Sequence, residues 1–147
     1  MEGNRHVTMT VESTRSITAV NRNGIRLMID PEGEHGFTPL ELFLTALGSC
    51  SAVDLAHLMK KQRDPVTPFT VDVDGLKEDT RMQWMRVTYR IDREADPRKL
   101  ERARVKTAED LCTVSRTLSS GCSVEHVVIG GGPMGAAGRP GARDTVS

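Results

Sequence analysis

The chain has 147 residues, which suits one domain that can build a hydrophobic core without disulfide staples. Its 20 basic residues equal its 20 acidic residues, so its charge gives no reason to expect binding to nucleic acid or to an anionic membrane. Aromatic residues make up only 3% of the chain, which also disfavours a surface for stacking bases.

The first part of the chain predicts three strands. β-Branched residues alternate over residues 6–12, and residues 16–20 can form a second strand. The pair Asn23-Gly24 is a hairpin signal that returns the chain into residues 25–29. The ten polar N-terminal residues do not have the pattern of a secretory signal. Three cysteines without such a signal fit a reducing compartment, so we expect a cytoplasmic protein.

A long helix is predicted next. Thr38 can cap it, Pro39 suits its first position, and Glu41 suits its first turn. An Asp-Pro pair ends it after about residue 63. The apolar stretch 40–59 has membrane-like length, but its charged and polar residues favour a buried helix of a soluble protein. Because it is apolar on nearly all sides, we expect a partner subunit to cover part of it.

The remaining elements complete an α+β fold. Strands 69–73 and 85–91 are expected to pair as a hairpin across the polar stretch 75–81. Asp96-Pro97 opens a second helix, which residues 114–118 either continue or follow as a separate short helix, and 123–129 predicts a closing strand. We therefore expect one domain over residues 1–129. The Gly-rich and Pro-rich residues 130–147 predict a disordered tail.

The cysteines differ in their sequence surroundings. Cys50 lies mid-helix among small residues, which permit close approach of another backbone or of a ligand, although composition alone favours a buried, inert thiol. Cys112 would lie near a helix N-terminus, which lowers a thiol pKa, if the helix restarts there, and Arg116 could add positive charge. Cys122 would share a strand face with Val124, His126 and Val128 and is interpreted as a packing or incidental residue.

Asp54 and His57 share a helix face with Cys50, at i+4 and i+7. Such a group could be a nucleophile with its base, or part of a zinc ligand set. The chain has no Cys-x-x-Cys or His-Glu-x-x-His motif, so we expect no metal site.

Two segments resemble the OsmC/Ohr family. Residues 39–54, Pro-Leu-Glu-Leu-Phe-Leu-Thr-Ala-Leu-Gly-Ser-Cys-Ser-Ala-Val-Asp, are similar to its first cysteine motif, and residues 111–118, Leu-Cys-Thr-Val-Ser-Arg-Thr-Leu, to its second. The two cysteines are 62 residues apart, which also suits the family. Within it, the chain looks most similar to the YhfA-like branch.

The resemblance implies an intertwined homodimer, with long helices at its centre and thiol sites at its interface. It also implies a thiol-dependent peroxidase that reduces organic hydroperoxides. In that role Cys50 is the attacking thiolate, Cys112 closes a disulfide with it, and a dithiol reductant reopens the bond. Neither a metal nor an organic cofactor is implied.

Such chemistry needs a cation near the reacting oxygen, and the family supplies an arginine held by a glutamate. Arg15 is the best match, with Arg22 and Arg26 as rivals, and Arg15 could instead be a solvated turn residue. Glu41 stands one position later than the glutamate of the hydroperoxide reductases. At about 100° per residue it falls on the helix face opposite Cys50, so it could instead be a capping residue.

A second hypothesis is a binding or sensing protein that has the same fold but no catalytic activity. The chain would then bind a small apolar ligand or sense redox state through slowly reacting thiols. A third gives the tail 130–147 an interaction role.

Overall fold

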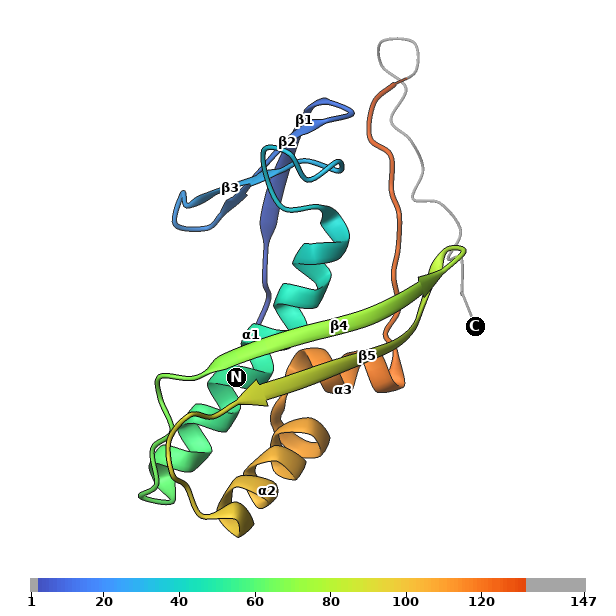
Figure 1. Cartoon of the computed structure of the whole chain (residues 1–147). Coiled ribbons are helices and arrows are strands. Elements are labelled where there is room, and N and C mark those ends of the chain that lie inside the picture. Colours follow the sequence, from blue (N-terminus) through green and yellow to red (C-terminus); the bar gives the residue numbers. More distant parts are fainter. Residues whose placement is uncertain (1–2, 132–147) are drawn as a thin grey trace.

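A computed structural model describes residues 3–131 and begins with a three-stranded antiparallel sheet. Its strands are β1 (Val7–Ser13), β2 (Ser16–Asn21) and β3 (Arg26–Ile29), in that order across the sheet. The Asn23-Gly24 turn closes β2 onto β3, as predicted, with Gly24 at a φ of 78°. Every residue of β1 is exposed, so this sheet stands beside the start of the long helix without a layer covering β1 (Figure 1).

The long helix α1 (Pro39–Lys61) begins as predicted. The Thr38 hydroxyl accepts a hydrogen bond from the Glu41 N–H, and the Glu41 carboxylate accepts one from the Thr38 N–H. This capping box satisfies two backbone donors at the helix start. By length and composition α1 could also cross a membrane. It nevertheless packs against strands and helices on several sides, as the core helix of a folded domain does (Figure 1).

Strands β4 (Thr70–Glu78) and β5 (Arg81–Arg90) form one long antiparallel hairpin across α1 (Figure 1). The predicted hairpin is confirmed, but its loop is only the two residues Asp79 and Thr80, because the polar stretch also pairs in the ladder. A Cβ atom on Gly48 would lie 2.6 Å from a Val73 methyl carbon. Glycine therefore lets β4 approach the helix closely, as the small residues around Cys50 predicted.

Three short helical segments follow the hairpin. They are α2 (Pro97–Lys106), the π-helical turn η1 (Thr107–Leu111) and α3 (Thr113–Ser120). Asp96 caps α2 by accepting from the N–H groups of Arg98 and Lys99, as predicted. The helical path is interrupted at Cys112, between η1 and α3. Residues 114–118 therefore belong to a separate helix, which was one of the two expected arrangements.

A compact apolar cluster joins α1 to α2. Its fully buried members are Leu55, Met59, Val66 and Ala103, and half-buried residues such as Leu100 and Tyr89 pack around them. Burial of this kind is the main source of stability in a small domain. The cluster holds α2 against α1, and η1 and α3, which flank Cys112, also contact α1.

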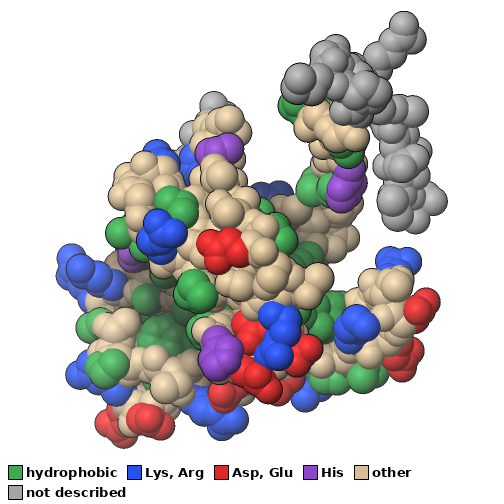
Figure 2. Space-filling view, turned by 90° about the horizontal axis from the view of Figure 1, so that it is seen from above, with side chains coloured by type: hydrophobic (Ala, Val, Ile, Leu, Met, Phe, Trp, Pro, Cys, Tyr) green, Lys and Arg blue, Asp and Glu red, His purple; other side chains and the backbone are tan. Residues whose placement is uncertain are grey.

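The prediction of a closing strand at 123–129 is wrong for this chain. The segment is extended but pairs with no strand among residues 3–131, and it stands away from the body as an arm (Figures 1 and 2). An extended segment is a strand only when a neighbour completes its hydrogen bonds. Val124, Val128 and Ile129 are 64%, 75% and 90% exposed, so the alternating apolar pattern lacks a packing surface among the described residues. Residues 132–147 of the predicted tail lie outside the described residues.

Candidate active site

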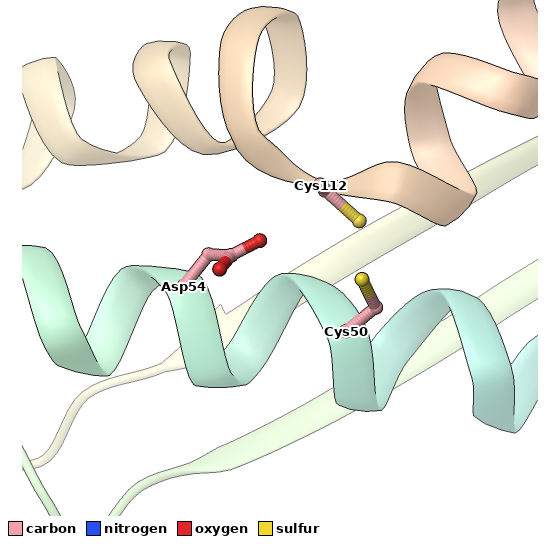
Figure 3. Close-up of side chains that lie close together, drawn as sticks. All are labelled: Cys50, Asp54 and Cys112. Carbon is pink, nitrogen blue, oxygen red and sulfur yellow. The ribbon is translucent and has the colours of Figure 1, made fainter. Parts of the chain in front are cut away.

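Cys50 and Cys112 come together in the fold, with Asp54 beside them. The two sulfurs and a carboxylate oxygen of Asp54 all lie within 4.8 Å of one another. Figure 3 shows the three side chains pointing toward one another, two from α1 and one from the break that precedes α3. Both cysteines are free thiols; Cys50 is partly accessible and Cys112 is completely buried.

Cys112 is the N-cap of α3, as its sequence position suggested. Its backbone is extended, and its sulfur accepts a hydrogen bond from the Ser115 N–H at 3.4 Å. Arg116 does not reach the thiol, because its guanidinium donates instead to the Asp110 carbonyl. The helix start therefore presents backbone N–H groups, rather than a side-chain cation, to the sulfurs.

The surroundings of Cys50 favour its neutral thiol. Burial raises the pKa of Cys50, and the Cys112 thiol and the Asp54 carboxylate reinforce this rise, whereas the Val114 N–H opposes it. Desolvation and nearby negative charge both disfavour a thiolate. Among residues 3–131, therefore, no neighbouring cation activates Cys50.

This pKa shift predicts the pH dependence of Cys50 alkylation. Thiolate is the reactive form, so the rate should rise with pH and have its midpoint above that of an ordinary thiol, about 8.5. Modification by iodoacetamide, followed for each cysteine by mass spectrometry and referenced to a short cysteine peptide, measures the midpoint. A midpoint at or below that of the peptide would show that a cation from outside this chain reaches Cys50.

The buried Ser51 and the half-buried Tyr89 extend from Cys112. The Ser51 hydroxyl lies 3.3 Å from the Cys112 sulfur, and the Tyr89 phenol lies close to Ser51. Burial raises the pKa of Tyr89, while the Ser51 contact acts in the opposite direction. In the sequence, Ser51 is only one of the small residues around Cys50, and Tyr89 is only one residue of a predicted strand. Ser51 could have been recognised as a site residue because it directly follows Cys50, whereas no sequence signal places Tyr89 near the thiols.

Arg15 is not joined to Cys50 in this chain. It lies in the turn between β1 and β2, where its guanidinium is 2.6 Å from Glu34, 3.5 Å from Glu32 and 3.8 Å from Asp30. The Glu32 N–H holds the pKa of buried Asp30 below its usual range, with help from the His35 and Glu34 N–H groups and from Arg15. The structure thus places Arg15 in an acidic loop cluster, with 46% of its side chain exposed.

Glu41 lies on the opposite side of α1 from the thiols, as the helix geometry predicted. It belongs to the capping box and contributes to an open hollow of about 560 Å³ between α1 and β4. The apolar lining of this hollow includes Phe37, Leu44, Phe69, Val71 and Val73. The expected pairing of Arg15 with Glu41 is therefore not formed within the described chain.

The other candidates lie apart from the cluster. His57 is exposed and is not a member of it, so of the two residues that share a face with Cys50 only Asp54 approaches the thiols. Cys122 is exposed and lines an open hollow beside α3, so it is not a packing residue, which leaves the incidental role that was the other expectation. The strand face on which Cys122 was expected does not form, because residues 123–129 pair with no strand among residues 3–131.

The family follows from the sequence as well as from this geometry. A family model described as OsmC-like protein matches residues 31–127. The chain belongs to the OsmC-like family. Its α+β architecture is that of the family, as predicted, while assignment to the YhfA-like branch stays a prediction.

Solved structures show the same fold at low sequence identity. An OsmC-like protein from Mycoplasma pneumoniae matches with a TM-score of 0.73 and 15% identity, over 82% of this chain and 91% of that one. A hypothetical protein from Aquifex aeolicus matches with a TM-score of 0.67 and 23% identity, over 82% and 90%. The organic hydroperoxide resistance protein OhrB of Bacillus subtilis matches with a TM-score of 0.54 and 20% identity, over 79% and 92%. No curated protein sequence matches the chain.

Proposed function

We propose that this OsmC-like protein reduces organic hydroperoxides with its two thiols. The observation that carries the proposal is the pairing of a partly accessible Cys50 with a buried Cys112, their sulfurs within 4.8 Å. A peroxidatic thiol must be reached by substrate, whereas a resolving thiol needs only to reach the first sulfur. The likeness to OhrB, named for organic hydroperoxide resistance, supports the same chemistry.

The reaction balances with these two thiols and an external dithiol. The Cys50 thiolate attacks the terminal peroxide oxygen, the O–O bond breaks, and the alkoxide leaves as an alcohol after taking a proton. Cys50 is then a sulfenic acid. The Cys112 sulfur attacks it, water leaves, and a disulfide forms; a dithiol reductant restores both thiols by exchange.

Ser51 and Tyr89 give the buried thiol a route for its proton. Cys112 must lose a proton when it attacks, and it is completely shielded from solvent. The Ser51 hydroxyl at 3.3 Å is within reach of that proton, and the Tyr89 phenol lies beyond it. We assign these two residues as positioning residues for the resolving step.

We also propose that a second copy of the chain completes the site. Within residues 3–131, the exposed apolar residues of β1 and of the arm 123–129 lack a packing surface, and α1 carries the exposed Val53 three residues after Cys50. A homodimer would cover them, and it could bring a cation such as Arg15 to the other copy's Cys50. Free thiols and a dithiol reductant also suit the cytoplasm, where we place the protein.

The proposal is tested by peroxide consumption in the presence of a dithiol. Purified full-length protein should consume an alkyl hydroperoxide faster than it consumes hydrogen peroxide, with one disulfide formed per peroxide before reduction. Consumption no faster than that of the dithiol alone would contradict a peroxidase.

A second candidate function rests on the hollow between α1 and β4. Its volume of about 560 Å³ and its apolar lining fall within the range of small-ligand sites, and it lies away from the thiols. The protein would then bind an apolar molecule and use its cysteines only for slow redox sensing. Saturable binding of an apolar fluorescent probe, together with no peroxide turnover, would favour this function over the first.

A further inference from the structure

The thiol pair and Asp54 form a donor set that suits a metal ion. Two sulfurs and a carboxylate oxygen lie within 4.8 Å of one another. In a tetrahedral zinc site, with bonds of about 2.0–2.3 Å, neighbouring donor atoms are about 3.3–3.8 Å apart. Side-chain rotations that move each donor by about 1 Å would therefore close the set around one ion.

The charge of the group formed by Cys50, Asp54 and Cys112 also favours a bound cation. With both thiols deprotonated, the half-buried Cys50 and Asp54 and the buried Cys112 carry three negative charges close together. Among residues 3–131, no salt bridge joins Asp54 to a basic side chain, since the ion pairs of the chain lie elsewhere. A divalent cation would supply the compensating charge that the surrounding side chains do not.

Polar donors already surround the sulfurs. The Ser115 N–H donates to the Cys112 sulfur at 3.4 Å, the Ser51 hydroxyl lies 3.3 Å from the same sulfur, and the Val114 N–H faces Cys50. Hydrogen bonds of this kind orient ligands and stabilise thiolates in metal centres. The helix start of α3 thus provides outer support for two ligand sulfurs.

We infer that Cys50, Asp54 and Cys112 bind one zinc ion per chain, with the fourth position left for water. Two thiolates and a carboxylate match the ligand preferences of zinc and are less suited to the hard ions magnesium and calcium. Binding itself does not depend on peroxide reduction. Its consequence rests on the proposed function: zinc holds both thiolates and so stops turnover, and disulfide formation removes two ligands and releases the ion.

Metal binding is measured on the reduced full-length chain without peroxide. Titration with Zn²⁺ against a chromophoric chelator should give one site per chain, and Co²⁺ should give thiolate-to-metal charge-transfer absorption. Zn²⁺ should slow alkylation of Cys50 and Cys112 at least about tenfold and leave Cys122 unaffected, since Cys122 lies outside the cluster. Absence of a site, or equal protection of all three thiols, would overturn the inference.

Variants then assign the ligands. Asp54→Asn keeps the shape of the side chain and should weaken Zn²⁺ binding at least about tenfold, and Cys50→Ser should weaken it further. The matched control Cys122→Ser should bind as the unmodified chain does. Unchanged affinity in Asp54→Asn, with the fold verified by circular dichroism, would show that the carboxylate is not a ligand. A chain that binds zinc but does not consume peroxide in its metal-free, reduced form would refute the proposed function and leave this site standing.

Discussion

Cys50→Ser is expected to lower the rate of alkyl hydroperoxide consumption at least about 100-fold, because a serine hydroxyl is almost never ionised at neutral pH and cannot replace a thiolate nucleophile. The substitution exchanges one atom at a partly exposed position, so the fold should be preserved. Turnover is measured with a saturating dithiol and a fixed peroxide concentration. Cys122→Ser makes the same chemical change at an exposed thiol outside the cluster and should turn over normally.

Cys112→Ser separates the two steps of the same reaction. The first oxidation should proceed at the normal rate, because Cys50 remains in place, but it should stop at sulfenic acid without a partner thiol. A dimedone adduct on Cys50, found by mass spectrometry after one equivalent of peroxide, identifies that intermediate. If the unmodified chain accumulates the same adduct and no disulfide, Cys112 is not the resolving thiol.

Local sequence signals predicted most of the architecture. Thr38 and Asp96 mark the starts of α1 and α2 correctly. A helix cap is a hydrogen-bond motif among a few consecutive residues, so it does not depend on the rest of the fold. The Asn23-Gly24 turn is right for the same reason. Helix periodicity placed Glu41 opposite Cys50 and suggested a capping role for it, and the capping box confirms that role.

The errors arise where structure depends on a neighbour. The segment 123–129 has a strand pattern, but a strand needs a partner to complete its hydrogen bonds, and this chain offers none among its described residues. Arg15 likewise has no local signal that distinguishes a catalytic residue from one paired with nearby carboxylates, here Glu34 and Asp30. The pairing of Cys50 with Cys112 came from the family resemblance, because contact between residues 62 apart cannot be read from local pattern.

The thiol pair also depends on the apolar cluster that joins α1 to α2, and Leu55→Ala is expected to destabilise the protein by about 2–5 kcal/mol. Leu55 is completely buried against Met59, Val66 and Ala103, so truncation leaves a cavity between the helices. The loss is measured as the change in free energy of unfolding in urea, at one fixed chain concentration because an oligomer unfolds in a concentration-dependent manner.

Leu55→Met is the matched control, since it nearly conserves volume and should cost less than about 1.5 kcal/mol. Leu55 belongs to the apolar cluster and not to the group of Cys50, Asp54 and Cys112. Peroxide turnover per folded Leu55→Ala chain should therefore be unchanged at urea concentrations well below the unfolding midpoint. Equal stability of Leu55→Ala and the unmodified chain would mean that the cluster does not hold α2 and the Cys112 segment against α1. A large loss of turnover in fully folded Leu55→Ala would instead mean that the separation of the two sulfurs is set by packing at Leu55 itself.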